Sequence, residues 1–282
     1  MNRNERTISA RDTVAICEAG FYELANGARV NITKALAAAK AGTKLYSPEK
    51  LATAVMSNAA FSTCFEVRNE TTFQALARLS EGKSGHIACL NFASAKNPGG
   101  GFLNGAIAQE EALASASGLY PCLLHAPDYY SRNRANRSTL YLDLAIFSPL
   151  VPFFRNDAGK LLAKPILASV ITAPAPNAGA IAQNEPENLP LLEETLRRRA
   201  ELVLGIAAAE HIDQLVLGAW GCGVFRNDPR LVARVFADLL IPTAKFGSSF
   251  SEVTFAVFDR SENAGTYKAF ASAFEKTESN FP

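Results

Sequence analysis

This 282-residue chain has few histidines, no clustered cysteines and little net charge, and each of these features excludes a class of function. Only three histidines are present, at positions 86, 125 and 211, and the five cysteines lack the spacing of a metal-binding motif. A zinc site is therefore not expected, and scattered thiols of odd number are typical of a reducing cytoplasm. The net charge of +1 excludes the strongly basic surface of a general nucleic-acid-binding protein.

Long apolar runs are also missing. No segment approaches the roughly 18 apolar residues that a membrane-spanning helix needs. Residues 1–14 are polar and lack the apolar centre of a secretory signal. We therefore expect a cytoplasmic protein without membrane association. Because 48% of the residues are hydrophobic, the chain can bury a large core.

Residues 1–60 show helical patterns. The segments RDTVAICEAGFYEL, ITKALAAAKAG and SPEKLATAVM each have an amphipathic spacing, and Ser47 and Pro48 mark a helix start in the third. We expect this segment to be an amino-terminal helical extension packed on a core of residues 61–282. A separate interaction module is the alternative, although the short connections argue against it.

From residue 61 onward, strand and helix patterns alternate, which favours an α/β fold. The predicted strands are residues 61–69, 86–94, 143–154, 164–174, 214–220 and 252–259. The predicted helices are residues 71–82, 111–117, 189–210, 230–240 and 263–276. The arginine-rich segment 131–138 is predicted to be a loop.

The most informative segment is NPGGGFLNGAIAQEE, at residues 97–111. Its three consecutive glycines allow a backbone to approach a ligand closely and to adopt unusual conformations. They follow a predicted buried strand, and open α/β sheets bind ligands where strands end. Two adjacent carboxylates, Glu110 and Glu111, repel each other and lower the stability of the fold beside such a loop. Their presence there is therefore typical of a site that binds hydroxyls or transfers protons. The structural alternative is a wide turn followed by carboxylates that stabilise a helix start.

A second glycine loop, GCGVF, occupies residues 221–225 after another apolar strand. Asp228 and Pro229 are typical first residues of a helix, so a helix begins just beyond the loop. Backbone N–H groups in front of a helix start suit a diphosphate, although a plain tight turn explains the pattern equally well. Because no histidine lies near Cys222 in the sequence, we interpret it as a small residue that fits the loop rather than as a nucleophile.

Together these segments resemble the signature of poly(ADP-ribose) glycohydrolases, GGG followed by a short spacer and QEE, and specifically the microbial type of that family. The segments VITAPAPNAGA, TFAVFD and LYSPEKL lie where the family has them, so the resemblance covers nearly the whole chain. It implies a macrodomain-like three-layer α/β/α sandwich with a mixed central sheet and the amino-terminal helical extension. It also implies poly(ADP-ribose) or an ADP-ribosylated protein as substrate and ADP-ribose as product ligand. We expect a monomer that needs no cofactor.

The resemblance assigns catalysis to Glu111, the second glutamate of QEE. As general acid this residue protonates the leaving oxygen, and its carboxylate then activates the attacking water. The resemblance leaves the ribose hydroxyls to Glu110. The other implied substrate-binding residues of the two loops are Asn97, Gly99, Gly100, Gly101, Gln109, Gly221, Cys222, Gly223, Val224 and Phe225.

Macrodomains usually bind adenine just after the first core strand and with an aromatic residue near the end of the last strand. Glu70, between Asn69 and Thr71, lies at the first place, and Phe258 lies at the second. In the alternative interpretation, Asn69 or Thr71 caps the following helix and Phe258 is a core residue.

The predicted activity is hydrolysis, mainly from chain ends, of the ribose–ribose O-glycosidic bonds of poly(ADP-ribose). A mono-ADP-ribosyl hydrolase acting on protein or nucleic-acid adducts is an alternative, because a fold does not fix a substrate. A non-catalytic ADP-ribose reader is the third possibility. The adjacent pair Glu110 and Glu111 argues against it, since a pure binding protein needs no pair of groups that exchange protons.

Overall fold

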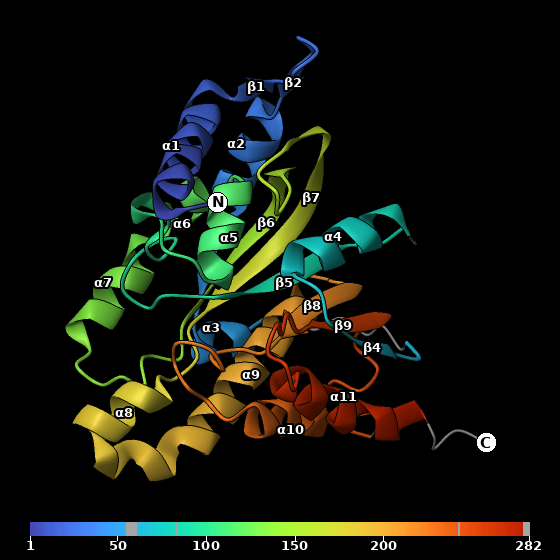
Figure 1. The fold of residues 1–282 in the computed structure, drawn as a ribbon. Helices are drawn as coiled ribbons and strands as arrows, with labels where there is room; N and C mark the ends of the chain where they lie inside the picture. The colour runs from blue at the N-terminus through green and yellow to red at the C-terminus, as the bar shows by residue number, and fades with distance from the viewer. Residues whose placement is uncertain (55–60, 83, 242, 279–282) are drawn as a thin grey trace.

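A seven-stranded mixed sheet lies between two layers of helices in the computed structural model, which describes residues 1–54, 61–82, 84–241 and 243–278 (Figure 1). The strand order is β3-β6-β7-β5-β8-β9-β4. Strands β7, β5, β8, β9 and β4 are parallel, whereas β6 is antiparallel to both β3 and β7. The strands are β3 (Lys44–Tyr46), β4 (Cys64–Arg68), β5 (Ile87–Phe92), β6 (Ala145–Arg155), β7 (Leu161–Ala173), β8 (Gln214–Gly218) and β9 (Glu252–Ala256). The predicted α/β/α sandwich with a mixed sheet is confirmed.

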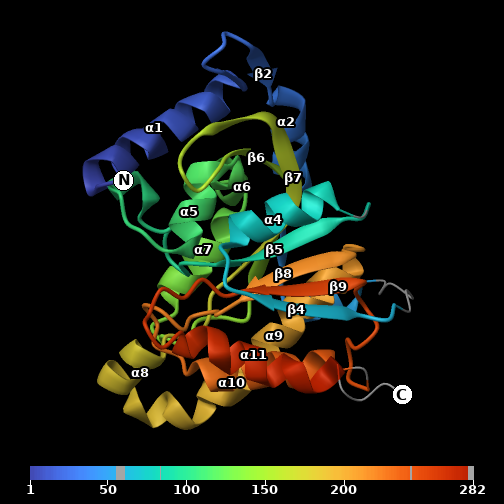
Figure 2. The same ribbon diagram turned by 45° about the vertical axis from the view of Figure 1, so that its right-hand side comes forward.

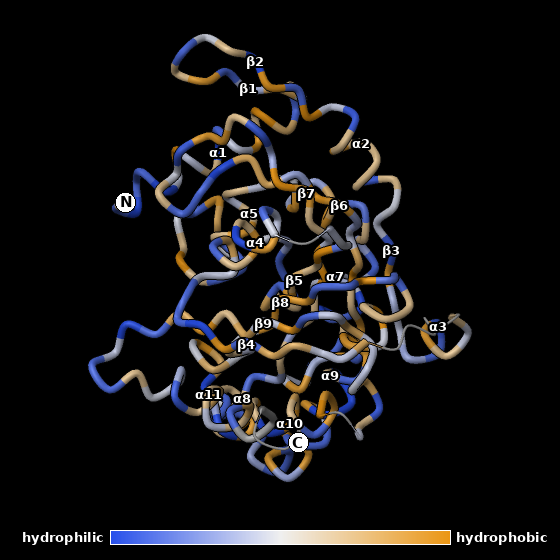
Figure 3. Tube along the Cα trace, turned by 90° about the vertical axis from the view of Figure 1, so that its right-hand side faces the viewer, coloured by the Kyte–Doolittle hydropathy of each residue, from blue (hydrophilic) through white to orange (hydrophobic). Residues whose placement is uncertain are grey.

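Two apolar clusters correspond to the two helical layers, because successive side chains of a strand point to opposite faces. One face of the sheet packs on α9 (Leu192–Ala209), α10 (Pro229–Leu240) and α11 (Gly265–Glu278). The other packs on α2 (Thr33–Gly42), α4 (Thr72–Glu81), α5 (Gln109–Ala116), α6 (Leu119–Leu123) and α7 (Pro127–Ala135). Figure 2 shows α4 and α5 on one side of the parallel strands and α10 and α11 on the other. The apolar colouring of β8 and β9 in Figure 3 agrees with their burial on both faces.

The amino-terminal segment contains strands as well as helices, so the expectation of helices alone was wrong. Besides α1 (Arg3–Ala19), α2 and α3 (Pro48–Ala52), it has a hairpin of β1 (Phe21–Glu23) and β2 (Arg29–Asn31) and the edge strand β3. Strands of three residues are too short to produce a recognisable alternation of apolar and polar residues. The end of the third predicted helix and the boundary proposed at residue 60 fall within residues 55–60, outside the described part of the chain. The division into extension and core stays a prediction.

The other predicted strands and helices coincide with observed elements, apart from small shifts at their ends. The exception is the expected loop at 131–138, because α7 continues through Ala135. Pro127 and Asp128 in its first turn favour a helix start, but its polar composition conceals the helical pattern. Four further elements are not predicted from the sequence: α6, α8 (Ala178–Asn184) and the 3-10 helices η1 (Phe102–Asn104) and η2 (Pro186–Leu191). None of the helices in the described residues has the length and apolar character needed to cross a bilayer.

Candidate active site

The carboxyl ends of the five parallel strands meet at one edge of the sheet, and this brings the predicted site residues together. The first glycine loop follows β5 and the second follows β8, which is the neighbour of β5 in the sheet. The loops after β7, β9 and β4 leave the same edge. The site is therefore built from loops on a rigid sheet.

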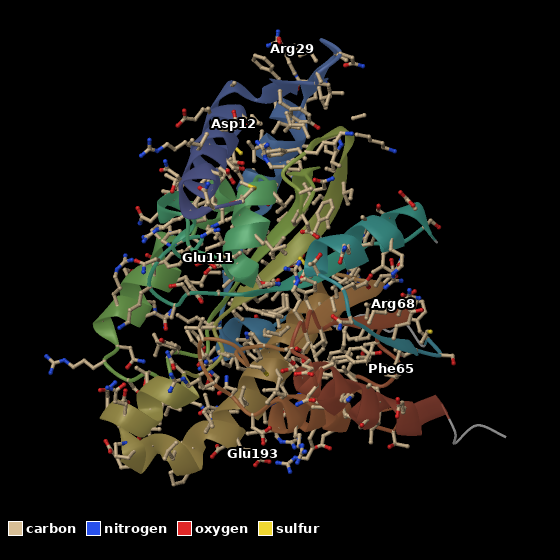
Figure 4. All side chains as sticks on the ribbon, viewed as in Figure 1. Asp12, Arg29, Phe65, Arg68, Glu111 and Glu193 are labelled. Atoms are coloured by element: carbon tan, nitrogen blue, oxygen red, sulfur yellow. The ribbon has the colours of Figure 1, made fainter. Side chains whose placement is uncertain are left out.

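The first glycine loop closes around the two carboxylates at the start of α5, where Figure 4 shows Glu111. The backbone N–H of Gly101 donates to Glu111 Oε1 over 2.9 Å. Gly100 has a φ of +60°, and a Cβ there would overlap the same oxygen. The carbonyl of Asn97 closes the turn by accepting from the Gly100 N–H (3.0 Å), while the Asn97 side chain is exposed. Gly99 has a φ of +68° and is also adapted to this turn.

Glu110 lies beneath the loop and is only 3% exposed. Its Oε2 accepts from the Ser94 N–H (2.6 Å) and its Oε1 from Asn91 Nδ2 (3.3 Å). Burial raises the pKa of Glu110 to about 8, and the charge of Glu111 acts in the same direction. Hydrogen bonds from the Ser94 backbone, the Asn91 side chain and the Gly99 backbone favour the ionised form and oppose this increase. The two adjacent glutamates therefore occupy different environments, one buried and one at the loop surface.

Gln109 anchors the start of α5 to the end of β5. Its Oε1 accepts from the Phe92 N–H (2.8 Å). Its Nε2 donates to the Leu90 carbonyl (2.8 Å) and to Thr72 Oγ1 (3.1 Å). These contacts position the following two glutamates. The predicted contact of Gln109 with substrate stays a prediction.

The second glycine loop is fastened to the loop after β7. Gly221 has a φ of +72°, and a Cβ there would overlap Asn227 Nδ2 and the Ala175 side chain. Asn227 is buried, and its Nδ2 donates to the Pro176 carbonyl (3.0 Å). Trp220 Nε1 donates to the carbonyl of the last residue of β7 (3.1 Å). These contacts fix the base of the loop and leave its tip free to face a ligand.

The tip of the second loop presents unused hydrogen-bond donors. Within the described residues, the backbone N–H groups of Gly223, Val224 and Phe225 donate to no acceptor. Val224 is 80% exposed, and a Cβ on Gly223 would have no atom within 4 Å. Because the loop precedes the start of α10, these donors suit an anionic group such as a diphosphate. Burial raises the pKa of Cys222 to about 12, which disfavours the thiolate form that a nucleophile needs at neutral pH.

A buried arginine that the sequence analysis missed supports the wall of the site. Arg199 of α9 is fully buried and pairs with Asp143 (2.9 Å). It also donates to the carbonyls of Pro174 (2.9 Å) and Tyr141 (3.2 Å). The Tyr141 backbone has a φ of 60°, and its ring lies 6.1 Å from that of Phe225. The sequence contains only three consecutive arginines here, and nothing in that run distinguishes the buried one.

The candidate adenine residues lie on two loops that are joined to each other. Asn69 Nδ2 donates to the Asp259 carbonyl (2.9 Å), and the Asp259 N–H donates to Asn69 Oδ1 (3.0 Å). Thr71 caps α4, as the alternative interpretation has it, and Glu70 pairs with Arg78 (2.8 Å).

Phe258 is 50% exposed, so its alternative interpretation as a core residue was wrong. The guanidinium of Arg260 lies 4.6 Å from the centre of the Phe258 ring. A cavity of about 420 Å³ lies between the start of α10 at Asp228 and a segment of residues 261–269, which includes the first turn of α11. The described residues contain no group of His, Cys, Asp and Glu side chains arranged to hold a metal ion.

Comparisons with known proteins find one family throughout. Residues 10–156 match the family model of the microbial-type PARG catalytic domain, PARG being poly(ADP-ribose) glycohydrolase. The crystal structure of PARG from Thermomonospora curvata has a TM-score of 0.91 and 45% identity, over 96% of this chain and 100% of that chain. The same enzyme bound to the inhibitor ADP-HPD has a TM-score of 0.90. PARG from Deinococcus radiodurans in complex with ADP-ribose has a TM-score of 0.79 and 52% identity, over 86% of this chain and 97% of that chain. No curated protein matches the sequence.

The buried Glu110 carboxyl predicts a specific pH dependence of stability. Between its ordinary pKa of 4.5 and its folded pKa of about 8, the native state holds a proton that the unfolded state has lost. The contribution of Glu110 to the free energy of unfolding is thus fully present below the lower value and is lost as pH rises through the upper value. Urea unfolding of the wild type and of Glu110→Gln, from about pH 5 to pH 8, measures this contribution. We expect a weaker fall of stability with pH in Glu110→Gln, and parallel curves would contradict the prediction.

Proposed function

The chain belongs to the family of microbial-type poly(ADP-ribose) glycohydrolases, and we propose that it cleaves the ribose–ribose O-glycosidic bonds of poly(ADP-ribose) and releases ADP-ribose. The resemblance predicted from the two glycine loops is confirmed by the family match and by identities of 45% and 52% to solved PARG structures. The protein is a glycosidase with a macrodomain-like fold. It acts mainly at chain ends, with one terminal ADP-ribose unit held between the two loops.

The observation that carries the proposed mechanism is the unequal environment of two adjacent carboxyls. Glu111 lies at the surface of the glycine loop, and only one of its oxygens receives a backbone hydrogen bond. Glu110 is buried and held from several sides. Paired carboxyls in different environments are typical of sites that divide acid–base and binding roles. We assign proton transfer to Glu111, because the resemblance gives that role to the second glutamate of QEE and because its carboxyl lies at the loop surface, where a substrate can approach it. Although burial raises the pKa of Glu110, that carboxyl is enclosed beneath the loop, and we assign it to the hydroxyls of the terminal ribose.

The reaction begins when protonated Glu111 donates its proton to the oxygen that leaves the anomeric carbon of the terminal ribose. The bond between that carbon and oxygen breaks through an oxocarbenium-like transition state, and the shortened polymer departs with a new hydroxyl. The Glu111 carboxylate then accepts a proton from the water that attacks the anomeric carbon. Free ADP-ribose forms, and Glu111 returns to its protonated state.

The rest of the ligand follows the edge of the sheet in this proposal. The diphosphate accepts hydrogen bonds from the free amides of Gly223, Val224 and Phe225. The adenosine end lies towards the joined loops after β4 and β9, where the exposed ring of Phe258 offers a stacking surface. ADP-ribose is present in the D. radiodurans relative, which supports it as the product ligand here.

We further propose that the protein is a cytoplasmic monomer. Cys17, Cys89, Cys122 and Cys222 form no disulfide bond, which agrees with a reducing compartment. Removal of mono-ADP-ribose from a protein or nucleic acid remains the second enzymatic candidate, because the same glutamate pair suits that bond. The two activities differ in substrate and are separated by the assay below.

Replacement of Glu111 tests the catalytic assignment. Glu111→Gln keeps the size of the side chain and removes the exchangeable proton, so turnover of poly(ADP-ribose) should fall by about a hundredfold or more. Release of free ADP-ribose is measured by chromatography, and ADP-ribose affinity by calorimetry should stay nearly unchanged. Glu81→Gln, at an exposed position at the end of α4, is the matched control. Turnover of Glu111→Gln within a few-fold of wild type would show that Glu111 is not the acid.

The wild type tests the choice of substrate. If it binds ADP-ribose tightly but releases none from the polymer, the protein is a reader or acts on another ADP-ribosyl bond.

Gly223 offers a clean test of the diphosphate site. Because a Cβ there meets no neighbouring atom, a larger side chain leaves the fold intact and occupies the space in front of the loop. We expect Gly223→Phe to weaken ADP-ribose binding by about tenfold or more in calorimetry, with an unchanged thermal midpoint. Gly223→Ala adds only one methyl group and should lose less affinity. Equal affinity of Gly223→Phe and wild type would show that the second loop does not hold the phosphates.

A further inference from the structure

The amino-terminal helix α1 is bound directly to the first glycine loop (Figure 2). Arg3 Nε donates to the carbonyl of Asn104 (3.0 Å), and Arg6 Nε donates to the carbonyl of Gly105 (2.9 Å). Gly105 has a φ of +70°, and a Cβ there would overlap the Arg3 carbonyl. The turn between the GGG and QEE segments is thus shaped to fit against α1.

Apolar and polar contacts attach α1 on both sides of this turn. Ala10 packs in a small buried cluster with Phe102, which follows the glycines, and with Ala114 of α5. Thr13 is buried, and its Oγ1 donates to the Ser115 carbonyl (2.6 Å). The helix therefore holds both the glycine turn and the helix that carries the two glutamates.

A series of backbone hydrogen bonds leads from Arg6 to the glycines. The Gly105 carbonyl that accepts from Arg6 shares its peptide group with the N–H of Ala106, which donates to the Gly101 carbonyl (3.2 Å). That carbonyl shares its peptide group with the Phe102 N–H, which donates to the Gly99 carbonyl (3.3 Å). Hydrogen bonds linked through peptide groups in this way strengthen one another.

From these contacts we propose that Arg6, assisted by Arg3, is a positioning residue for Glu111, and that α1 holds the first glycine loop in the conformation that catalysis requires. The proposal rests on the function proposed above. A run of glycines has little conformational preference of its own, so an outside support must select one arrangement. Charge-assisted hydrogen bonds from two guanidinium groups supply that support. The Gly101 N–H that orients Glu111 lies within the supported segment.

The expected kinetic effect is on the chemical step rather than on binding. Misplacement of a catalytic group lowers turnover strongly, whereas the diphosphate is assigned to the second loop, which is fastened separately through Asn227 and Trp220. We expect Arg3→Ala/Arg6→Ala to lower kcat by about tenfold or more, while KM and the Kd for ADP-ribose change by less than about threefold. Arg6→Lys should recover part of kcat, because an ammonium group can still donate to one carbonyl.

Arg11→Ala is the matched control. Arg11 lies on the same helix, is exposed, and makes no hydrogen bond or ion pair within the described residues. Its kcat should equal that of the wild type. If the double variant also retains wild-type kcat, the proposal is overturned.

A double-mutant cycle separates positioning from a general loss of structure. In the Glu111→Gln background, the arginine replacements should reduce the residual activity little further, because both changes act through the same proton transfer. Full additivity of the two losses would overturn the positioning role.

Hydrogen exchange tests the proposal without relying on activity. A peptide spanning residues 99–111 should exchange faster in Arg3→Ala/Arg6→Ala than in the wild type or Arg11→Ala, at equal global stability. Unchanged exchange would overturn the proposal even if the wild type were active. Faster exchange in the double variant, together with an inactive wild type, would show that the arginines order the loop. In that case the proposed function would be wrong, but the support of the loop by α1 would stand.

Discussion

The close approach of a bare backbone to two carboxylates is the constraint on which the rest of this site depends. Glu110 and Glu111 need hydrogen-bond donors within a space that a Cβ at Gly100 would fill. The loop therefore has to pass through left-handed conformations at Gly99 and Gly100. Such a flexible segment keeps one shape only if its surroundings impose it. The anchoring by Gln109, the turn at Asn97 and the contacts from α1 all serve this requirement.

Burial then distinguishes two side chains that are chemically identical and adjacent in sequence. Glu110 points beneath the loop, where loss of solvation favours its neutral form. Glu111 is only partly buried and lies at the loop surface, as its proposed role in proton transfer requires. The second loop contrasts with the first, because its amides at 223–225 are left without acceptors. The first loop thus uses a backbone donor on the protein's own carboxylate, whereas the unused donors of the second loop are the ones proposed to bind the diphosphate.

The parts of the site that could be predicted from sequence are those whose partners are close along the chain. The GGG and QEE segments, and the loop that ends at Asp228, lie between strand and helix signals that are clear by themselves. The support by Arg199 could not be predicted, because its partner Asp143 is 56 positions away and two neighbouring arginines look the same. The contacts of Arg3 and Arg6 span 101 and 99 positions along the chain. Their acceptors are backbone carbonyls, which every residue type has, so the sequence does not indicate which residue accepts. The edge strand β3 was missed because its three residues are held in an extended conformation by pairing with β6 and not by a local sequence pattern.

The same long-range contacts make the amino-terminal segment a structural part of both the central sheet and the site. Its β3 completes one edge of the main sheet, its α2 packs on one face of that sheet, and its α1 lies against the turn between the GGG and QEE segments. Coupling between two such contacts is reciprocal as a matter of thermodynamics. If α1 lowers the free energy of the ordered glycine loop, a ligand that orders the loop lowers the free energy of docked α1 by the same amount. Substrate binding at the sheet edge and attachment of the first helix are then two aspects of one equilibrium, which links the glycine loop to the amino-terminal segment of the chain.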